Sequence, residues 1–317
     1  MNRNDMLYKV CALVGAGTLV SVGLGILSTI RYQLHRSNLQ RYHHGKEPWV
    51  LITGATGDGI GLAFVHQFAQ SGFNVILHGR NEAKLNKVLT QMQQNYSDRI
   101  FKILVLDAAT PPGPEFDRAV LDAVENLRLT VLVHNVAGSG ASQPVMTFYE
   151  ELPSQEVEGW INVNVRFVSH LTHLLLPILL QNQPGLMIFM SSAAADFTSP
   201  GLALYTSSKA FVEALARVLA MEMKVGGHDV EVKTISTGMV ATAGSGRNEK
   251  DISFTVPNTT NFVKSTLNTI GYGDVKVIPY LGHRLQFGFL RSLPYWVKEK
   301  MLLYYTQMAK DQMNKRT

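Results

Sequence analysis

Short apolar runs alternate with amphipathic stretches between residues 48 and 280. A compact apolar run bounded by glycine or polar residues predicts a buried strand, and apolar residues recurring every three or four positions predict a helix. The expected strands are 49–53, 73–77, 103–106, 131–133, 186–190, 230–235 and 276–280, and the expected helices are 60–71, 82–95, 115–127, 155–180, 203–224 and 259–270. This alternation is typical of βαβ units, so we expect an α/β fold: a doubly wound parallel sheet with helices on both faces.

Two apolar segments lie outside this alternation. Residues 10–30 contain no charged residue, and about 20 apolar residues suffice to cross a bilayer. We expect a retained transmembrane helix there, because the alternative, a cleavable signal peptide, has a shorter apolar core that ends at a small-residue cleavage site. Residues 285–309 are also unusually apolar. They predict either a C-terminal packing helix or, more sharply, an apolar substrate cap or membrane-surface helix.

These segments divide the chain into a large domain with an extension at each end. The expected parts are an N-terminal tail at 1–9, a transmembrane anchor at 10–30, a basic linker at 31–47, the α/β domain at 48–282 and an apolar C-terminal helical extension at 283–317. Four basic residues lie within 31–46, against two before the anchor. The positive-inside rule then places the large domain in the cytosol.

The net charge and the cysteine and histidine content indicate which binding partners and covalent links the chain can have. The net charge of +5 comes partly from the basic linker, which suits anionic lipid headgroups. Nucleic acid is the rival explanation, but the sequence shows neither a compact basic stripe nor a nucleic-acid-binding motif. The single cysteine, Cys11, lies within the anchor and leaves no disulfide framework, in agreement with a reducing compartment. The ten histidines show no metal-ligand pattern, so we expect no metal site.

A glycine-rich loop follows the first expected strand and reads Thr53-Gly54-Ala55-Thr56-Gly57-Asp58-Gly59-Ile60-Gly61. Glycines at this place allow a tight turn and let backbone N–H groups approach a pyrophosphate at the helix N-terminus. A plain turn is the alternative. The position between strand and helix favours a dinucleotide site of the Rossmann type.

The end of the second strand indicates which dinucleotide is bound. NAD-binding folds usually place a carboxylate there for the ribose 2′-hydroxyl, whereas an arginine accommodates a 2′-phosphate. This chain has His78 and Gly79 followed by Arg80, and no carboxylate precedes Glu82. We therefore expect NADPH, although Arg80 as an ordinary solvated loop residue is the alternative. Asp107, at the end of the third strand, is either an acceptor for the adenine amino group or a turn aspartate.

Three Tyr-x-x-x-Lys pairs occur, at Tyr42/Lys46, Tyr205/Lys209 and Tyr272/Lys276, and only the second opens a long apolar helix directly after a strand. Residues four apart on a helix share one face. A neighbouring ammonium favours the phenolate, so we expect a lowered pKa for Tyr205 and a role in general acid–base chemistry at a carbonyl or alcohol. Ser192 lies upstream, where a strand could deliver a second hydrogen-bond donor to the same oxygen.

The chain resembles the short-chain dehydrogenase/reductase superfamily over roughly residues 48–280. The motifs that carry the resemblance are the glycine loop, Asn135-Val136-Ala137-Gly138, Asn164, Ser192 and Tyr205-x-x-x-Lys209. The anchor, Ile161-Asn162-Val163-Asn164 and Ser292-Leu293-Pro294-Tyr295-Trp296 are similar to a narrower branch. That branch holds the membrane-bound 17-beta-hydroxysteroid dehydrogenases and very-long-chain 3-oxoacyl-CoA reductases.

The resemblance implies a role for each matching residue. Tyr205 would donate or accept the proton, Ser192 would polarise the carbonyl, and Lys209 would also bind the nicotinamide ribose. Asn164 would hold a water in the proton relay, with Asn162 as the competing choice. The expected cofactor-binding residues are Gly54, Thr56, Gly59, Ile60, Gly61, Arg80, Asp107, Asn135, Ala137, Tyr205, Lys209 and Thr242. Asn135 and Ala137 would lie near the adenosine ribose and Thr242 near the carboxamide.

Three positions depart from the family pattern. Four residues rather than three separate Gly54 from Gly59, His134 replaces the first asparagine of the usual Asn-Asn-Ala-Gly motif, and Thr237 replaces the proline normally found before Gly238. Each could loosen cofactor binding, and none removes a catalytic group.

The leading hypothesis is a membrane-anchored, NADPH-dependent oxidoreductase that reduces a ketone on a hydrophobic substrate. A 3-oxoacyl-CoA, a steroid ketone and a terpenoid or polyketide ketone all remain open. The alternative of another class is a non-catalytic NADP-binding scaffold at the membrane. The resemblance further implies an endoplasmic-reticulum location with a cytosolic catalytic domain, and a homodimer formed through the helix near 155–180.

Overall fold

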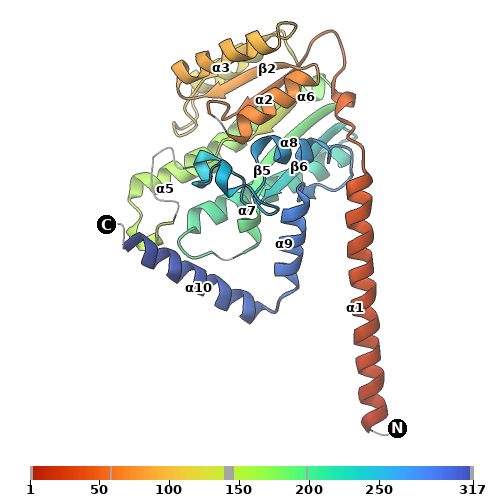
Figure 1. Ribbon diagram of the computed structural model, residues 1–317. Helices are drawn as coiled ribbons and strands as arrows, with labels where there is room; N and C mark the ends of the chain where they lie inside the picture. The colour runs from red at the N-terminus through yellow and green to blue at the C-terminus, as the bar shows by residue number, and fades with distance from the viewer. Residues whose placement is uncertain (1–2, 58, 139–145, 198, 315–317) are drawn as a thin grey trace.

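The computed structural model describes residues 3–57, 59–138, 146–197 and 199–314. Its centre is a seven-stranded sheet in the order β3-β2-β1-β4-β5-β6-β7, with every neighbouring pair parallel (Figure 1). The strands are β1 (Pro48–Thr53), β2 (Asn74–Gly79), β3 (Phe101–Val105), β4 (Arg128–His134), β5 (Gly185–Ser192), β6 (Val230–Thr237) and β7 (Lys276–Val277). The expected doubly wound parallel sheet is confirmed, although β7 is shorter than predicted.

Helices cover both faces of this sheet. One core cluster takes side chains from α2 (Ile60–Gln70), α3 (Glu82–Asn95) and α8 (Thr259–Leu267), and the other from α4 (Pro114–Val124), α6 (Phe167–Gln181) and α7 (Ala203–Val225). The central strands β1, β2 and β5 are buried at every residue. A parallel sheet covered on two faces requires such unbroken apolar strands, which is why the short apolar runs predicted the strands well.

The long helix expected at 155–180 is interrupted. The structure has α5 (Ser154–Ile161), a π-helical turn at Asn162–Arg166 and then α6. A π-helical turn frees backbone groups from the regular hydrogen-bond ladder and often marks a functional site. Hydrophobic periodicity could not reveal the interruption, because the turn preserves the helical direction of the chain.

An N-terminal helix, α1 (Arg3–Leu34), projects away from the sheet domain (Figure 1). It contains the whole segment expected to cross a membrane, and large apolar side chains such as Leu13, Leu19 and Leu24 are exposed on it. Among the described side chains, the stretch Ser154–Gln181 has the length and composition of a membrane span. Its residues Leu171 and Leu175 lie in the core, so that stretch covers the sheet.

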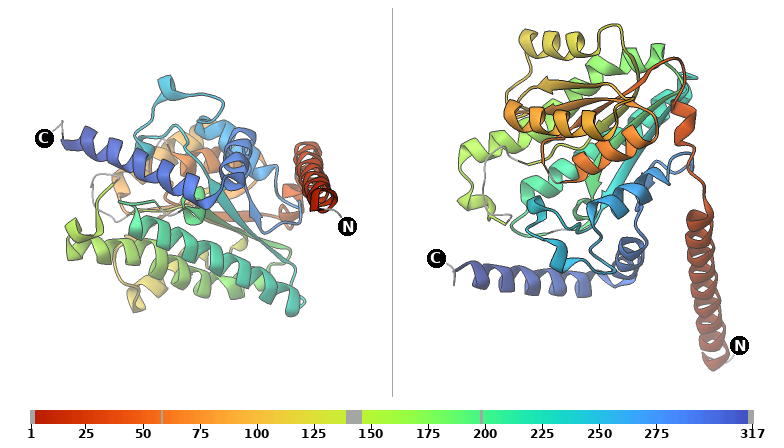
Figure 2. Two further views of the ribbon diagram at one scale, coloured as in Figure 1. Left: turned by 90° about the horizontal axis from the view of Figure 1, so that it is seen from below. Right: turned by 45° about the horizontal axis from the view of Figure 1, so that its top comes forward.

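The C-terminal extension forms two helices, α9 (Leu281–Ser292) and α10 (Tyr295–Asn314). Arg284 of α9 donates to the Ser28 hydroxyl of α1 at 2.9 Å and lies 4.3 Å from the ring centroid of Tyr32. Seen along α1 from below, α10 runs crosswise beneath the sheet domain (Figure 2). The apolar tail therefore contacts α1 at one end and extends across the same side of the molecule.

Two buried histidines lie at the carboxyl ends of β2 and β4. His78 stacks on Phe167, and His134 stacks on Phe189 and shares a 2.9 Å hydrogen bond with the Thr172 hydroxyl. Burial lowers the pKa of His78 to about 4 and that of His134 to about 3. His134, one of the three departures from the family pattern, therefore fills the core beside α6 as a neutral ring.

These two histidines predict loss of stability in mild acid. In the unfolded chain each histidine takes up a proton below pH ~6.5, whereas the folded chain resists protonation, so the free energy of unfolding falls as pH drops from about 6.5 toward 4. The slope approaches about 1.4 kcal/mol per pH unit for each histidine. Urea denaturation of detergent-solubilised protein at pH 7 and pH 5 measures it. His134→Asn should reduce the slope, whereas the same change at the exposed His228 should not, and equal slopes would contradict the assignment.

Candidate active site

The predicted site residues come together at the carboxyl ends of the strands. Thr53, His134 and Ser192 are the last residues of β1, β4 and β5. The strand order reverses between β1 and β4, and a crevice outside the carboxyl ends at such a reversal is where open α/β sheets bind ligands. The site is therefore placed by the topology of the sheet.

Tyr205 lies in the first turn of α7, with its phenol within hydrogen-bonding reach of Ser192 at the end of β5. The Ser192 hydroxyl itself donates to the Thr237 carbonyl at 3.4 Å. The ring of Trp160, from α5, packs edge-on against Tyr205 with 5.8 Å between ring centroids. The Ser192 oxygen also accepts from the backbone N–H of Ala194 at 3.1 Å, which orients the hydroxyl. Two hydroxyl groups thus converge at one point, as required to hold a single carbonyl oxygen.

Lys209 is buried one helical turn beyond Tyr205. Its ammonium donates to the backbone carbonyl of Met190 at 2.7 Å, and the Ser191 hydroxyl donates to the Lys209 carbonyl at 3.1 Å. Burial lowers the pKa of Lys209 to about 8. These bonds join α7 to β5 and fix the spacing between the serine and the tyrosine.

The expectation of a lowered pKa for Tyr205 is wrong in this structure. Burial of the phenol raises its pKa, and the hydrogen bond from Ser192 offsets only part of that effect. The Lys209 ammonium, which was expected to favour the phenolate, points to Met190 instead. Tyr205 is therefore protonated at neutral pH and is suited to act as a proton donor.

Asn164 lies in the π-helical turn and braces the neighbouring loop. Its amide nitrogen donates to the carbonyls of Gly138 at 2.7 Å and Trp160 at 2.9 Å, and its oxygen accepts from the Gly138 N–H at 3.3 Å. Both amide protons are thus bound to backbone, so a relay water could contact this side chain only through its oxygen. Asn162, the competing choice, accepts a hydrogen bond from Arg166 at 2.5 Å.

The base of the glycine loop is held by Thr53 and Asn135. The Thr53 hydroxyl accepts from the backbone N–H groups of Asn135 at 2.8 Å and Val136 at 3.0 Å. The Asn135 amide donates to the carbonyls of Thr53 at 2.9 Å and Gly54 at 3.2 Å. Asn135 therefore stabilises the loop. Its predicted place near the adenosine ribose remains a prediction, as does that of the exposed Ala137.

Two glycines of the loop are required by close backbone contacts. Gly54 has φ +72°, which favours glycine, and a Cβ on Gly61 would lie 2.1 Å from the Gly54 carbonyl oxygen. A Cβ on Gly57 or Gly59 would meet no described protein atom within 4 Å. Gly59, the N-cap of α2, has no side chain to accept from the helix. Among the described residues the first N–H groups, including those of Ile60 and Gly61, are therefore not capped by a side chain and suit an anion. The open glycines and uncapped helix fit a dinucleotide pyrophosphate.

The loop also contacts the end of β2. The Thr56 methyl lies so close to Gly79 that a Cβ there would be 2.1 Å away. Arg80 follows directly and is exposed, at the place expected for a group that meets a 2′-phosphate. The carboxylate of Asp107 accepts from the Ala109 N–H at 2.9 Å, as in an ordinary Asx turn. Its part in adenine binding therefore remains a prediction.

Thr242 lies in a loop that the C-terminal extension braces. Its hydroxyl accepts from the Ser245 N–H at 3.1 Å and caps a short 3-10 helix. Upstream, the Gly238 N–H donates to the ring of His283 at 3.3 Å, and the same ring bonds the Met239 carbonyl at 2.9 Å. His283, in the first turn of α9, is fully buried. Sequence reasoning missed it, because a histidine beyond the expected domain carries no local signal of this long-range contact.

A chain of ion pairs links the site to α9. Asp196, just after Ser192, binds both Lys276 at 2.7 Å and Arg291 of α9, and Lys276 also lies 2.8 Å from Glu213 of α7. Burial opposes ionisation of Asp196, but Lys276 and Arg291 outweigh it and lower the pKa of the carboxyl. The extension is thus attached to the turn that follows Ser192 and, through Lys276, to α7, which carries Tyr205.

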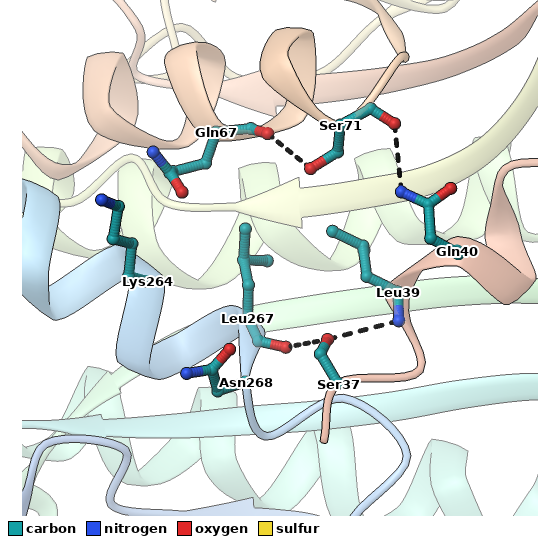
Figure 3. Close-up of a pocket in the computed structure, with 8 residues that line it drawn as sticks. All are labelled: Ser37, Leu39, Gln40, Gln67, Ser71, Lys264, Leu267 and Asn268. Atoms are coloured by element: carbon teal, nitrogen blue, oxygen red, sulfur yellow. Dashed lines mark hydrogen bonds between the residues drawn. The ribbon is translucent and has the colours of Figure 1, made fainter.

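A separate pocket of about 350 Å³ lies outside this site (Figure 3). The linker contributes Ser37, Leu39 and Gln40 to its lining, and α2 and α8 supply the rest. The Gln40 amide donates to the Ser71 carbonyl at 3.3 Å, and Ser37 donates to the Leu267 carbonyl at 2.5 Å. Because none of the predicted site residues lines it, this pocket is a junction between linker and domain.

Comparisons with known proteins agree with this geometry. A family model described as short chain dehydrogenase matches residues 48–253. A very-long-chain 3-oxoacyl-CoA reductase from Scheffersomyces stipitis is 30% identical over 298 residues, covering 91% of this chain and 81% of that protein. A very-long-chain 3-oxoacyl-CoA reductase-like protein from Arabidopsis thaliana is 31% identical over 271 residues, covering 84% of this chain and 82% of that protein.

Solved structures show the same fold. A 7beta-hydroxysteroid dehydrogenase has a TM-score of 0.69 at 24% identity and covers 82% of this chain and 96% of its own. At that identity the likeness concerns the fold alone. A short-chain dehydrogenase from Escherichia coli CFT073, complexed with NADPH, has a TM-score of 0.61 at 27% identity and covers 70% of this chain and 90% of its own.

The His283 contact predicts a local and a global effect. His283→Ala removes two hydrogen bonds and leaves a cavity, so we expect about 2–4 kcal/mol lower unfolding free energy. Hydrogen exchange should accelerate at the backbone amides of 238–242. His283→Asn, which can keep an acceptor for the Gly238 N–H, should cost less. Unchanged exchange in 238–242 upon the alanine substitution would show that α9 does not brace this loop.

Proposed function

Because the chain belongs to the short-chain dehydrogenase family of oxidoreductases, we propose that it uses NADPH to reduce a ketone on a hydrophobic substrate to an alcohol. The observation that carries the proposal is the approach of the Ser192 hydroxyl to the Tyr205 phenol, with Lys209 buried one turn away. Hydroxyl groups of this pair can bind one carbonyl oxygen, and the phenol can protonate it. A bound NADPH supplies the hydride.

The protonation state of Tyr205 supports reduction over oxidation. Burial keeps the pKa of the phenol above its ordinary value, so at neutral pH the proton is present to be given to a carbonyl oxygen. Alcohol oxidation would instead need the phenolate as a base. Ser192 donates to the same oxygen, and Lys209 holds α7 against β5 while retaining two further ammonium protons for a nicotinamide ribose.

The residues present fit NADPH. The pyrophosphate would lie at the uncapped start of α2, against Gly57 and Gly59, where a Cβ would meet no described protein atom. Arg80 directly follows β2, and among the residues from His78 to Asn81 there is no carboxylate to repel a 2′-phosphate. The NADPH-bound short-chain dehydrogenase from Escherichia coli supports the same choice.

A long-chain 3-oxoacyl-CoA is the leading substrate. The very-long-chain 3-oxoacyl-CoA reductase of Scheffersomyces stipitis matches 91% of the chain at 30% identity. The very-long-chain 3-oxoacyl-CoA reductase-like protein of Arabidopsis thaliana matches 84% at 31% identity. A steroid ketone and a terpenoid or polyketide ketone are the alternatives within the same chemistry. A non-catalytic membrane scaffold is disfavoured, because Ser192 lies beside the Tyr205 phenol and Lys209 is buried one helical turn away, as a ketone reductase requires.

We place the protein in a membrane through α1, with the catalytic domain in the cytosol and the endoplasmic reticulum as the leading organelle. The exposed leucines of α1 would be poorly accommodated in water, and the basic linker suits the cytosolic leaflet. Extraction with alkaline carbonate should leave the protein in the membrane pellet. Release into the supernatant would contradict an integral anchor.

A homodimer is supported by α7 rather than by the helix near 155–180 that was expected to form it. Leu171 and Leu175 of α6 are buried in the core, whereas α7 exposes Phe211, Val218, Met221 and Val225. Together with Ala214 these residues follow three-four spacing, the pattern of a helix seam that meets a second helix. We propose that two copies pair through this stripe.

The ketone reductase function predicts a sharp effect of one hydroxyl. With a 3-oxoacyl-CoA and NADPH, Tyr205→Phe should lower kcat by about 100-fold or more, because the carbonyl oxygen loses its proton donor. NADPH oxidation followed optically measures the rate. Tyr149→Phe, at an exposed tyrosine, is the matched control and should keep normal turnover. Normal turnover by Tyr205→Phe would refute the role, and absence of saturable NADPH binding in the wild type would favour the scaffold.

The α7 stripe predicts a change in mass. Val218→Lys together with Met221→Lys should convert the detergent-solubilised dimer to a monomer, because lysines at the seam bring like charges together. Light scattering after size exclusion reports the protein mass. Leu121→Lys, at an exposed site on α4, should leave the dimer intact. A wild-type protein of monomer mass would refute the dimer itself.

A further inference from the structure

The C-terminal helices expose an unusual number of large apolar side chains. Leu285 and Phe289 of α9 and Tyr295, Trp296, Leu303, Tyr304 and Tyr305 of α10 are each more than half exposed. Monomeric soluble proteins rarely present apolar surface of this extent without a partner. Tryptophan and tyrosine are the residues that gather at membrane–water interfaces, because each ring has an apolar body and a polar edge.

The charge of the extension complements an anionic surface. Residues 283–317 carry seven lysines and arginines against two acidic residues. Lys300 lies 5.7 Å from the ring centroid of Trp296, which places a cation beside an interfacial aromatic. Basic side chains near exposed aromatic rings are the composition expected of a helix that lies in the headgroup layer of a bilayer with anionic lipids.

The arrangement of helices gives this surface a direction. The view along α1 from below shows α10 lying lengthwise across the lower side of the molecule while α1 is seen end-on (Figure 2). Figure 1 shows that α1 projects from the domain toward this same side. A bilayer crossed by α1 would therefore meet α10 lying along its surface.

Contacts between α1 and α9 fix the level of the C-terminal helices along the proposed membrane span. Arg284 bonds Ser28 at 2.9 Å, and Tyr272 bonds the Ser28 carbonyl at 3.4 Å. From Arg284, α9 continues alongside α1 as far as Ser292 (Figure 1), which is about 12 Å at 1.5 Å per residue. Ser28 lies at the cytosolic end of the proposed span. The corner between α9 and α10 therefore lies beyond the level of Ser28, on the side of the domain from which α1 projects and where a bilayer surface would meet it.

The position of α10 is fixed at both ends. Arg291, just before the corner, is paired with Asp196. At the other end, the Lys310 ammonium lies 4.2 Å from the ring centroid of Phe148. These contacts attach α10 to the domain near each of its ends.

We infer that α9 and α10 form a second membrane contact. They enter the interfacial layer of the cytosolic leaflet, the leaflet through which α1 passes into the cytosol. The inference rests on the proposed anchoring by α1. Its occupant is a bilayer surface containing anionic lipid. The two contacts together hold the catalytic domain in one orientation relative to the bilayer. Phe148 lies beside α10, and the N–H of the neighbouring Thr147 bonds the Gly201 carbonyl at 3.0 Å. The segment that leads into α7, the helix of Tyr205, therefore lies close to the membrane.

Trp296 is a native probe for this contact. The chain has three tryptophans, so Trp49→Phe with Trp160→Phe leaves Trp296 as the only indole. The full chain is reconstituted in phosphatidylcholine–phosphatidylserine vesicles whose acyl chains carry bromine at a shallow or a deep position. Shallow bromine should reduce Trp296 emission by about twofold or more, and deep bromine less, as expected for an interfacial depth.

A second variant supplies the control. Gln93→Trp, added with all three native tryptophans changed to Phe, places the probe on an exposed face of α3, far from α1 and α10 (Figure 1). Its emission should be insensitive to bromine. Flotation of the vesicles reports anchoring separately. If the protein floats but bromine quenches Trp296 emission no more than emission from residue 93, the second contact alone is overturned. If the protein fails to float with the vesicles, the anchoring by α1 is overturned as well.

Discussion

The candidate active site depends on one buried hydrogen bond, from the Lys209 ammonium to the Met190 carbonyl. A charged group buried this deeply is costly unless hydrogen-bonded, and β5 supplies the acceptor. The bond fixes the first turns of α7 against the strand that ends at Ser192. Tyr205 and Ser192 consequently meet at one point, although they lie far apart in the sequence. Replacing the lysine would leave an unpaired carbonyl and free the helix to shift, so its structural and chemical roles are inseparable.

The C-terminal extension packs against the candidate active site and braces two of its loops, although it lies outside the domain expected from the sequence. His283 holds the backbone at Gly238 and Met239, and Arg291 joins the ion pairs of Asp196 and Lys276. Both contacts come from α9, which also binds α1 through Arg284. The helix that contacts the proposed anchor is thus the one that braces the loop carrying Thr242. One helix therefore contacts both the proposed membrane anchor and the loop expected to approach the cofactor.

The strands were predictable because β1, β2 and β5 are buried on both faces and read as unbroken apolar runs. The candidate catalytic residues were inferred from motif order and stay a prediction, and the structure brings two of them, Ser192 and Tyr205, together. Three features depend on contacts distant in sequence and were missed: the edge-on packing of Trp160 on Tyr205, the His283 brace and the direction of the Lys209 ammonium. The prediction of a lowered pKa for Tyr205 was wrong for the same reason. The spacing of Tyr205 and Lys209 shows that they are neighbours on a helix, but it shows neither the burial of the phenol nor which group the ammonium binds.

The central claim is that reduced nicotinamide and the Tyr205 phenol act on the same ketone. NADPH deuterated at the transferred position of C4, incubated with a 3-oxoacyl-CoA and the purified full chain, tests it directly by mass spectrometry of the product. The alcohol product should carry one deuterium on the carbon that bears the new hydroxyl. Alcohol formed without deuterium at that carbon, or no alcohol from any acyl, steroid or terpenoid ketone despite bound NADPH, would contradict it.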